Sequence, residues 1–489
     1  MKALFVTPEC YPLVKTGGLA DVAGALPLAL ASLGVETRVV LPAYPGVREQ
    51  LPGARKVAGL PDLFGGAGAL VAGTTAEGLH VLLVDAPHLF ARKGGGPYVG
   101  PDGRDWPDND LRFAALSWVG AQIALGKVGL WKPDVVHLHD WQSALTAAYL
   151  HQAKQAKGAA KQDVPPSLLT IHNLAFQGVF PHDVAERLRL PKLAFTFEGM
   201  EYWGNISYLK AGVQWCDHLG TVSPTYAREI LTHEQGMGFD GLLKLRADRL
   251  SGIVNGIDDH LWDPATDPLV PTPYSARRLA AKAFNKAALQ VELGLHVRTD
   301  VPLFCVVSRL TTQKGLDLLL DAMPVLHSRG AQLAVLGTGD RDIQDAFRRL
   351  AEAHHGQVST VIGFDEVLSH RFQAGADAIV VPSRFEPCGL TQLYGLRYGT
   401  LPVVARVGGL ADTVIDANEA ALRDGVATGF QFSPVDAVQL GVALDRACDL
   451  FADTLAWQRV QKRAMTREVG WGVAASTYLD LYQKLVNGR

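Results

Sequence analysis

Short runs of apolar, largely β-branched residues recur along the chain, separated by segments with helical spacing of apolar positions. Continuous rather than alternating apolar runs are typical of strands in a parallel sheet that is covered on both faces. We therefore predict the α/β class, with two Rossmann-like, doubly wound domains. The strands predicted in the first half are Ala3–Thr7, Glu36–Leu41, His80–Val84, Val135–His139, Ser167–His172 and His218–Ser223. Those predicted in the second half are Leu303–Ser308, Gln332–Leu336, Ser359–Gly363, Ala378–Pro382 and Leu401–Ala405.

The series of strands is interrupted between Asp263 and Arg298, where several prolines precede a predicted helix at Ala276–Leu293. Proline-rich interruptions of this kind are typical of domain boundaries. We predict one domain over residues 1–255 and a second over 256–472. The last segment, 473–489, has an amphipathic helical pattern and is predicted to form a C-terminal helix.

A strand, a glycine-containing loop and a helix follow one another in both halves. Lys15-Thr-Gly-Gly18 precedes a predicted helix at Leu19–Leu33, and Arg309–Gly315 precedes one at Leu316–His327. The string Gly-Gly-Leu-Ala-Asp also occurs twice, at 17–21 and 408–412. Chance explains such echoes in an α/β fold, and so do two similar nucleotide-binding domains facing one deep cleft; both explanations stay open here.

Charge and cysteine content exclude several classes of protein. The chain has 489 residues, with 46 basic and 49 acidic side chains and a formal net charge of −3. Such a balance provides no long-range attraction to nucleic acid or to a membrane, so we expect neither partner. The cysteines are odd in number and scattered, which favours a reducing compartment over a disulfide framework. With no apolar run of about 20 residues, we expect a cytoplasmic protein.

The loop after the first strand combines a lysine with glycines at the start of a predicted helix. Glycine allows a ligand close to the backbone, and the N-terminus of a helix offers free amides to an anion. Lys15, Gly17 and Gly18 are therefore candidates for binding a phosphate group. The pattern matches neither the P-loop nor G-x-G-x-x-G, and an ordinary tight turn with a surface lysine would look the same.

The second half offers two more loops at predicted strand ends, where ligands bind in open α/β sheets. Arg309 and Lys314 supply two cations suited to a diphosphate, although solvated loop residues would give the same pattern. The segment Ser383–Thr391 follows another strand. Its candidates for contacting sugar or phosphate are Glu386, Cys388, Gly389, Leu390 and Thr391. A salt bridge for Glu386 and simple burial for Cys388 are the alternatives.

Histidines and carboxylates gather at two further strand ends in the first half. His139, Asp140 and His172 are candidates for acid–base work, for binding hydroxyl groups or for binding a metal. We interpret the alternation of the strand as placing His137 and His139 on opposite faces, which disfavours a metal site. The strings Asp108-Asn-Asp110 and Asp340-Arg-Asp342 are interpreted as polar turns, so no metal and no other cofactor is predicted.

Taken together, these segments resemble the bacterial glycogen synthase and plant starch synthase family over nearly the whole chain. The motifs that carry the resemblance are Pro8–Val22, His139-Asp-Trp141, Thr170–Gly178, Val254–Asp258, Ser308–Gly315, Pro382–Leu390, Gly408–Leu410 and Gly470-Trp-Gly472. The resemblance implies a glycosyltransferase-B fold with the active site between its domains, and a C-terminal helix that crosses back to the first domain. It implies transfer of glucose from ADP-glucose to the non-reducing 4-hydroxyl of an α-1,4-glucan (glycogen), with retention of α configuration, release of ADP and no essential metal.

The resemblance also assigns roles to individual residues. Lys15 would bind the donor, and Arg309 and Lys314 would grip its diphosphate. Glu386 and Cys388 would lie near the donor glucose. The other positions implied at the site are Asp21, Tyr98, His139, Asp140, His172 and Asn255. Among all these residues, the catalytic ones would be Lys15, His172, Arg309, Lys314 and Glu386.

One position departs from the wider class of retaining glycosyltransferases, many of which carry a second glutamate where this chain has Tyr394. Members of the glycogen synthase family also lack that glutamate, so a mechanism with two carboxylates on this segment is not implied. Two alternatives stay open. One is a related retaining enzyme that uses UDP-glucose or another acceptor, and the other is a protein that binds nucleotide or glucan without catalysis. A phosphorylase is disfavoured.

Overall fold

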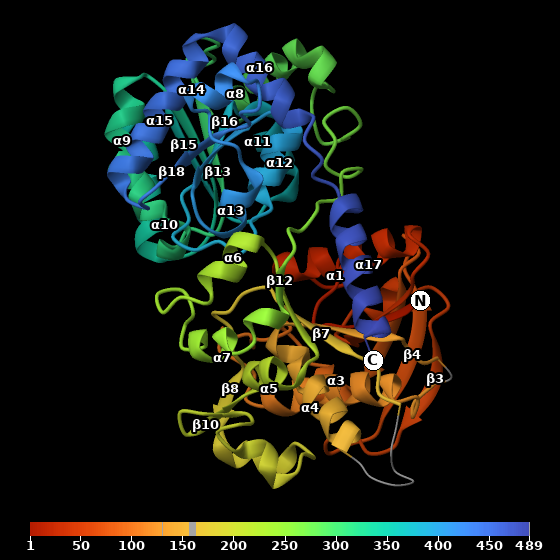
Figure 1. Cartoon of the computed structure of the whole chain (residues 1–489). Helices are drawn as coiled ribbons and strands as arrows, with labels where there is room; N and C mark the ends of the chain where they lie inside the picture. Colours follow the sequence, from red (N-terminus) through yellow and green to blue (C-terminus); the bar gives the residue numbers. More distant parts are fainter. Residues whose placement is uncertain (130, 156–162, 489) are drawn as a thin grey trace. The chain divides into compact units, whose positions relative to one another are not determined.

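The computed structural model describes residues 1–129, 131–155 and 163–488. Its contacts divide the chain into two compact units (Figure 1). Unit 1 comprises Met1–Val222, Ala227–Ile253 and Trp471–Arg489, of which Arg489 lies outside the described residues. Unit 2 comprises Ser223–Tyr226 and Val254–Gly470. Both units are α/β, as the apolar runs predicted.

Unit 1 is built on a 9-stranded sheet with the order β12-β11-β7-β6-β1-β2-β5-β4-β3. The strands pair in parallel except at β4, which pairs antiparallel with both β3 and β5. They are β1 (Lys2–Val6), β2 (Glu36–Pro42), β3 (Arg55–Leu60), β4 (Gly68–Thr74), β5 (His80–Asp85), β6 (Val135–His139), β7 (Ser167–Ile171), β11 (His218–Thr221) and β12 (Leu250–Gly252). A small antiparallel sheet contains β8 (Val179–Pro181), β10 (Asn205–Ser207) and β9 (Glu201–Tyr202).

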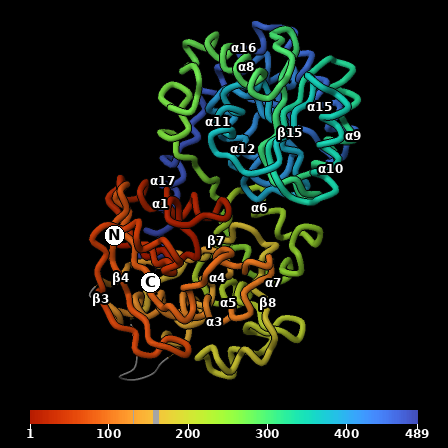
Figure 2. Tube along the Cα trace, turned by 180° about the vertical axis from the view of Figure 1, so that it is seen from behind, coloured from red at the N-terminus to blue at the C-terminus, as the bar shows by residue number. Residues whose placement is uncertain are grey.

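Helices cover this sheet, and the last of them comes from the far end of the sequence. The chain begins in unit 1 and returns to it with α17 (Trp471–Asn487), which contacts α1 and β6 (Figure 2). The other helices of unit 1 are α1 (Gly18–Ser32), α2 (Pro87–Phe90), α3 (Asn109–Ala124), α4 (Asp140–Gln155), α5 (Tyr208–Trp215) and α7 (Asp240–Lys244). Helix α6 (Pro224–Glu229) contributes residues to both units.

Unit 2 has a 6-stranded, wholly parallel sheet with the order β15-β14-β13-β16-β17-β18. The strands are β13 (Leu303–Val307), β14 (Gln332–Gly337), β15 (Val358–Ile362), β16 (Ala378–Val381), β17 (Leu401–Ala405) and β18 (Phe430–Phe432). Alternate residues of one strand enter different hydrophobic cores: Phe304 and Val306 pack in one, Leu303 and Cys305 in the other. Both faces of the sheet are therefore buried, which is why these strands read as continuous apolar runs.

The two cores of unit 2 are completed by helices on opposite faces of the sheet. One core includes residues of α9 (Leu316–Ser328) and α15 (Ala437–Ala452), and the other includes residues of α8 (Lys282–Glu292) and α11 (Glu366–Gly375) (Figure 1). The remaining helices are α10 (Arg341–Ala353), α12 (Thr391–Tyr398), α13 (Gly408–Thr413), α14 (Glu419–Arg423) and α16 (Thr454–Met465). Short 3₁₀ turns include η6 (Ala276–Ala281) and η7 (Thr312–Lys314).

Each sheet has one point where the strand order reverses. From β1 the chain continues outward through β2 on one side, and later through β6 and β7 on the other. In unit 2, β13 leads to β14 and β15 on one side, and β16 starts the other side. Because neighbouring crossovers leave in opposite directions at such a point, a crevice opens beyond the carboxyl ends of the two strands, and ligands of open α/β sheets bind there.

Every strand predicted from the sequence is present, with ends shifted by one or two residues at most. The strands that the apolar runs did not predict are β3, β4, β12, β18 and the small sheet. The predicted helix at Ala276–Leu293 is instead η6 followed by α8, because the backbone leaves helical geometry at Arg278.

Candidate functional site

A buried carboxylate, Glu9, organises the loop that follows β1 in unit 1. Glu9 is 3% exposed. Its Oε2 accepts hydrogen bonds from the backbone amides of Thr16 and Gly17, the latter at 3.3 Å, and its Oε1 accepts one from the Thr16 hydroxyl at 2.5 Å. One side chain thus fixes the turn that the sequence analysis singled out, and leaves Lys15, Gly17 and Gly18 at the surface.

Tyr98 reaches the same carboxylate from a distant part of the chain. Its hydroxyl donates to Glu9 Oε1, and its ring lies 5.8 Å from that of Phe113. Burial, followed by the negative charge of Glu9, raises the pKa of Tyr98 well above its ordinary value, so the phenol stays protonated and remains a donor. The predicted residues Tyr98 and Lys15 therefore share one anchor.

Lys15 and Asp21 form an ion pair at the beginning of α1. The Lys15 ammonium lies 2.7 Å from Asp21 Oδ1, and 41% of the Lys15 side chain is exposed. Gly17 is the N-cap of α1 and provides no side-chain cap. The first amides of a helix have no acceptor within it, so this end of α1 offers hydrogen-bond donors beside a cation.

Asp140 and His172 meet at the ends of the adjacent strands β6 and β7. Asp140 Oδ1 accepts from the His172 backbone amide at 2.6 Å and is 6% exposed. Burial raises the pKa of Asp140 to about 7, although hydrogen bonds from the backbone amides of His172 and Asn173 lower it. Burial also lowers the pKa of His172 to about 3, so its imidazole is neutral.

His137 and His139 lie on the same face of β6, so the expectation that they point to opposite faces was wrong. Residues two apart on a strand share a face, and the rings of these two histidines lie 4.2 Å apart. His139 is fully buried, with its Nδ1 2.9 Å from Nε2 of His172. Its side chain therefore reaches the candidate site only through His172.

The candidate residues of unit 2 lie beyond β13 and β16. The ammonium of Lys314, at the end of η7, lies 2.6 Å from Glu386 Oε2, which also accepts from the Ser383 hydroxyl at 2.9 Å. Gly315 has a φ of +68°, and a Cβ there would lie 1.9 Å from the Pro382 carbonyl oxygen. Glycine is thus required at this position for the two loops to approach each other.

Two arginines of unit 2 have different roles: one is exposed, and the other stabilises the loop that carries Lys314. Arg309 is exposed, and among the described residues its side chain donates one long hydrogen bond, of 3.5 Å, to Gln313 Oε1. Arg384, which the sequence analysis did not select, forms a double hydrogen bond with Asp317 at 2.7 and 2.6 Å and donates to the Thr312 carbonyl. Arg309 is therefore free to meet a ligand, whereas Arg384 holds the loop that carries Lys314.

Cys388, in the segment after β16, contacts Asn255. Burial raises the pKa of Cys388 to about 12, so it is a neutral thiol, although hydrogen bonds from Asn255 act in the opposite direction. Asn255 is 7% exposed, and its Oδ1 has no hydrogen-bond partner among the described residues. Gly389, with a φ of +73°, and Leu390 lead into α12, whose first residue is Thr391.

Comparisons with known proteins agree on one family. A family model described as starch synthase catalytic domain matches residues 2–245, and one described as glycosyl transferases group 1 matches 295–449. Glycogen synthase of Roseobacter denitrificans is 55% identical over the whole length of both chains. The chain belongs to the glycogen and starch synthase family. Glycogen synthase of Rhodopseudomonas palustris (strain HaA2) is 52% identical, covering 100% of this chain and 99% of its own.

Solved structures agree with the family. The catalytic domain of starch synthase IV from Arabidopsis thaliana, bound to ADP and acarbose, is 30% identical, with a TM-score of 0.88 and 99% of each chain covered. A sucrose-phosphate synthase from Thermosynechococcus elongatus, 17% identical with a TM-score of 0.59, shares the fold. The resemblance predicted from the motifs is thus confirmed: this member of the family is a hexosyltransferase with a glycosyltransferase-B fold.

Glu9 and Phe364 were missed by the sequence analysis. Glu9 was quoted within a motif, but nothing in its neighbours predicted that it accepts bonds from both a loop and a tyrosine. Phe364 follows β15 and is 84% exposed, which is unusual for so large an apolar side chain. It stands beyond the carboxyl end of a strand two positions from β13 in the sheet.

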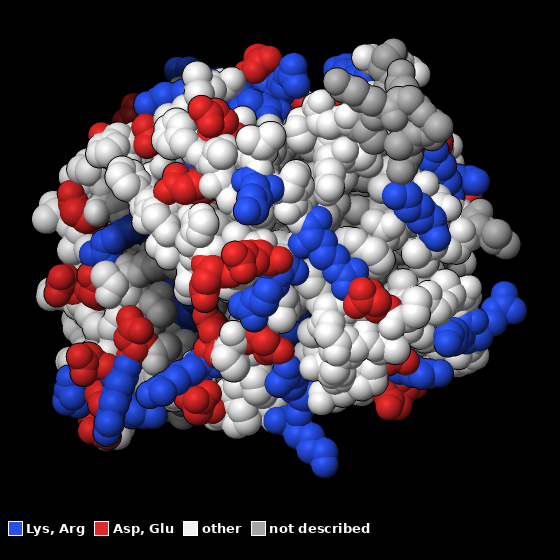
Figure 3. Space-filling model, turned by 90° about the horizontal axis from the view of Figure 1, so that it is seen from below, with Lys and Arg blue, Asp and Glu red and all other residues white. Residues whose placement is uncertain are grey.

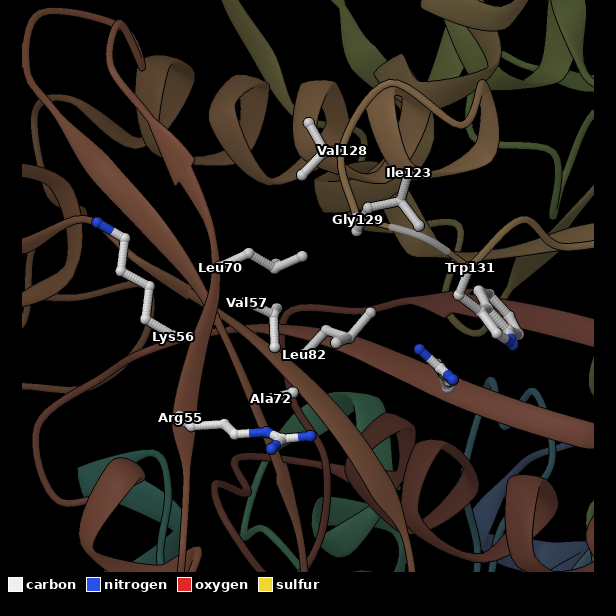
Figure 4. A pocket seen from close by; sticks show the side chains of 11 residues that line it. Arg55, Lys56, Val57, Leu70, Ala72, Leu82, Ile123, Val128, Gly129 and Trp131 are labelled. Atoms are coloured by element: carbon white, nitrogen blue, oxygen red, sulfur yellow. The ribbon is translucent and has the colours of Figure 1, made fainter.

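A separate cavity of about 490 Å³ lies over β2–β5 of this glycogen synthase family member (Figure 4). Its apolar floor includes Leu70, Leu82 and Ile123, and Arg38, Arg55 and Trp131 also line it. Arg38 lies near the amino end of β2, whereas the candidate residues follow the carboxyl ends of strands. None of the predicted site residues lines this cavity.

The two D-x-D strings lie in different structural settings. The first is not a polar turn as expected: Asn109 and Asp110 begin α3 and are buried, and Asp110 pairs with Arg187 at 2.8 Å. In the second string, Asp340 is the N-cap of α10. Within 1–129, 131–155 and 163–488, no group of three His, Cys, Asp or Glu side chains is arranged to hold a metal ion.

The molecular surface agrees with a balanced charge. On the face shown in Figure 3, acidic and basic side chains are interspersed rather than gathered by sign. In the described part of this family member, no helix is long and apolar enough to cross a membrane.

Proposed function

We propose that the chain transfers glucose from ADP-glucose to the non-reducing 4-hydroxyl of an α-1,4-glucan, with retention of configuration and release of ADP. The observation that carries this proposal is the position of the candidate residues. In unit 1, Lys15 follows β1 and Asp140 follows β6. In unit 2, Arg309 and Lys314 follow β13, and Glu386 follows β16. These are the two strands of each unit that flank the reversal of strand order. This is where open α/β sheets bind their ligands.

The diphosphate of the donor is the proposed ligand of Arg309 and Lys314. Arg309 is exposed and supplies several donors, and Lys314 is a point charge held in place by Glu386. As the bond between glucose and the diphosphate breaks, negative charge grows on the leaving phosphate. Fixed cations and the free amides at the N-terminus of α12 stabilise that charge, and this lowers the barrier.

Phe364 is the proposed platform for the base of the nucleotide. Neighbouring strands lie about 4.8 Å apart, so the loop after β15 is about 10 Å from the loop after β13. That separation matches the extent of a nucleoside diphosphate from its terminal phosphate to its base. An exposed aromatic ring stacks on a base regardless of its identity, so this contact supports a nucleotide donor without selecting adenine over uracil.

Unit 1 is proposed to serve the same reaction through Lys15 and Tyr98 and through Asp140 and His172. Lys15 supplies a further cation for the diphosphate, and His172 supplies a neutral imidazole for a sugar hydroxyl. Neither Glu386, which is paired with Lys314, nor His172 is a suitable base for the attacking hydroxyl. The leaving phosphate itself is the proposed proton acceptor, on the side from which ADP departs.

The choice of ADP-glucose over UDP-glucose rests on the relatives. The Arabidopsis neighbour is described as bound to ADP and acarbose, and the curated relatives are named glycogen synthases. We also propose that the protein acts in the cytoplasm. Its cysteines are free and buried, and a reducing compartment keeps thiols in that state.

The test is release of ADP with and without glycogen, using ADP-glucose and UDP-glucose alone and in competition. We expect release that requires glycogen and a preference for ADP-glucose. We expect Lys314→Ala to lower kcat/KM by a factor of about 100, since about 2.7 kcal/mol of transition-state stabilisation is lost. Lys56→Ala, an exposed lysine on β3, is the control. ADP release independent of glycogen, or near-normal turnover by Lys314→Ala, would refute the proposal.

A further inference from the structure

A row of buried polar side chains connects helix α17 to His172. Tyr482 on α17 lies 2.7 Å from His137 Nδ1, and His137 Nε2 lies 2.7 Å from the Thr170 hydroxyl. The His137 ring lies 4.2 Å from the His139 ring, and His139 Nδ1 lies 2.9 Å from His172 Nε2. Tyr482, His137, Thr170 and His139 are all fully buried, and His172 is 9% exposed. The row therefore ends at His172, the most exposed of its members.

The contact between His139 and His172 joins two ring nitrogens, so one must donate and the other accept. Both imidazoles are neutral, because burial lowers the pKa of each, and each ring therefore carries one proton. Either His139 donates from Nδ1 to His172 Nε2, or His172 donates from Nε2 to His139 Nδ1. The two arrangements differ in what they leave at the opposite nitrogen of His139.

That opposite nitrogen, Nε2 of His139, is buried and has no hydrogen-bond partner among the described residues. If His172 were the donor, His139 would carry its proton on Nε2, as a buried N–H group with no acceptor. Such a group costs about 1–3 kcal/mol, and orphaned buried donors are rarer than under-satisfied acceptors. If His139 is the donor, its Nε2 is only an unused acceptor. The hydrogen-bond network therefore favours the proton on His139 Nδ1.

The surroundings keep the His139 ring in the orientation that this bond requires. The Phe5 ring stacks on it, with ring centroids 5.5 Å apart and an interplanar angle of 16°. The backbone amide of His139 donates to the Ser143 hydroxyl at 2.6 Å. The neighbouring His137 is itself held at both ring nitrogens, by Tyr482 and Thr170. Buried rings with so many contacts do not exchange easily between orientations.

We propose that His139 is a positioning residue that fixes the tautomer of His172. By donating from Nδ1 to His172 Nε2, it places the His172 proton on Nδ1. His172 then offers an N–H donor to a ligand oxygen and has no free acceptor with which to take up a proton. This proposal rests on the proposed function, in which His172 faces a sugar hydroxyl, and it deepens it by stating which role His172 can perform.

The decisive measurement is the tautomer of His172 in the full-length protein. Histidine is labelled with ¹⁵N, and long-range ¹H–¹⁵N correlation spectra distinguish a protonated ring nitrogen from a bare one. The His172 signals are identified by their loss in His172→Asn. We expect protonated Nδ1 and bare Nε2. A wild-type His172 that is protonated on Nε2 would overturn the proposal, whether or not the protein transfers glucose.

Two substitutions of His139 separate its hydrogen bond from its packing. In His139→Asn the side-chain amide nitrogen comes near the position of Nδ1 and still donates to His172. In His139→Leu the volume is kept but the donor is lost. We expect His172 to keep its Nδ1 proton in the Asn variant and to become mixed between tautomers in the Leu variant. We also expect kcat/KM to fall about tenfold in the Leu variant and to be partly restored in the Asn variant.

The activity and tautomer readouts can fail separately. If both variants keep the wild-type tautomer of His172, the positioning role of His139 is refuted even if glucosyl transfer is normal. If the tautomer shifts as expected but kcat/KM is unchanged in the Leu variant, the role of His172 in the proposed function fails instead. Should His139→Leu not fold, the wild-type spectrum and His139→Asn still decide the tautomer.

Discussion

Glu9→Ala is the substitution with the most informative expected outcome, because one carboxylate anchors two parts of the candidate site. It accepts from two backbone amides and a hydroxyl of the loop around Lys15, and from the hydroxyl of Tyr98. Hydrogen bonds to charged groups contribute about 1.5–3 kcal/mol each, and a buried donor left without an acceptor costs about 1–3 kcal/mol. Since Thr16 and Gly17 are exposed and can turn to water, we expect the free energy of unfolding to fall by about 2–4 kcal/mol rather than by the full sum.

Glu9→Ala should lower activity as well as stability, by a similar free energy. The loop and Tyr98 lose their common anchor together, and we expect kcat/KM for the donor to fall about 100-fold, equivalent to about 2.7 kcal/mol. Urea unfolding measures stability, and ADP release well below the unfolding midpoint measures activity. Thr16→Val, which removes one of the hydrogen bonds, is the matched control and should lose less than tenfold. A folded Glu9→Ala protein with kcat/KM within threefold of wild type would refute this reasoning.

Three further outcomes are expected. Phe364→Ala should raise KM for the nucleotide sugar about tenfold with little change in kcat, because stacking on a base contributes about 1–3 kcal/mol; an unchanged KM would exclude Phe364 from the donor site. In the folded protein the pKa of Asp140 is about 7, above the ordinary 3.8. Between pH 4 and 7 the folded state therefore binds more protons than the unfolded state. The free energy of unfolding falls as the pH rises through this range, by up to about 4 kcal/mol. Asp140→Asn should flatten this dependence in urea unfolding at pH 4.5 and 7.5, and an equal slope in both proteins would count against it. EDTA should leave ADP release unchanged, and loss of activity that Mg²⁺ restores would contradict the absence of an essential metal.

The strands of both central sheets could be predicted because most of them are buried on both faces. Leu303–Val307 and Val135–His139 are buried throughout or nearly so, and only strands in that position have continuous apolar runs. The edge strands could not be predicted in the same way. Strand β3 is largely exposed and begins with two basic residues, and β4 is rich in glycine and alanine, which have low β propensity.

Residues of the candidate site could be predicted where they follow strands, but not where they depend on contacts between residues far apart in the sequence. Asp140 directly follows β6, and Lys15, Arg309 and Glu386 lie in loops that follow strands, so a rule about parallel sheets found them. The bond between Tyr98 and Glu9 joins residues that are 89 positions apart, and no local pattern records it. The error over His137 and His139 was of another kind, because the periodicity of a strand already places both on one face.

The two lysines proposed to meet the diphosphate are both paired with carboxylates, but their burial gives the pairs different consequences. Lys15 is 41% exposed beside Asp21, and an exposed ion pair contributes only about 0–1 kcal/mol. Lys15 can therefore leave Asp21 for a phosphate at little cost. The Lys314 and Glu386 side chains are only 19% and 9% exposed, and separating a buried pair costs about 3–5 kcal/mol. Lys314 therefore keeps its position whether or not a donor is bound. A charge that is already in place needs no reorganisation when the leaving phosphate becomes more negative, which is why we expect Lys314 to influence kcat and Lys15 to influence mainly the binding of the donor.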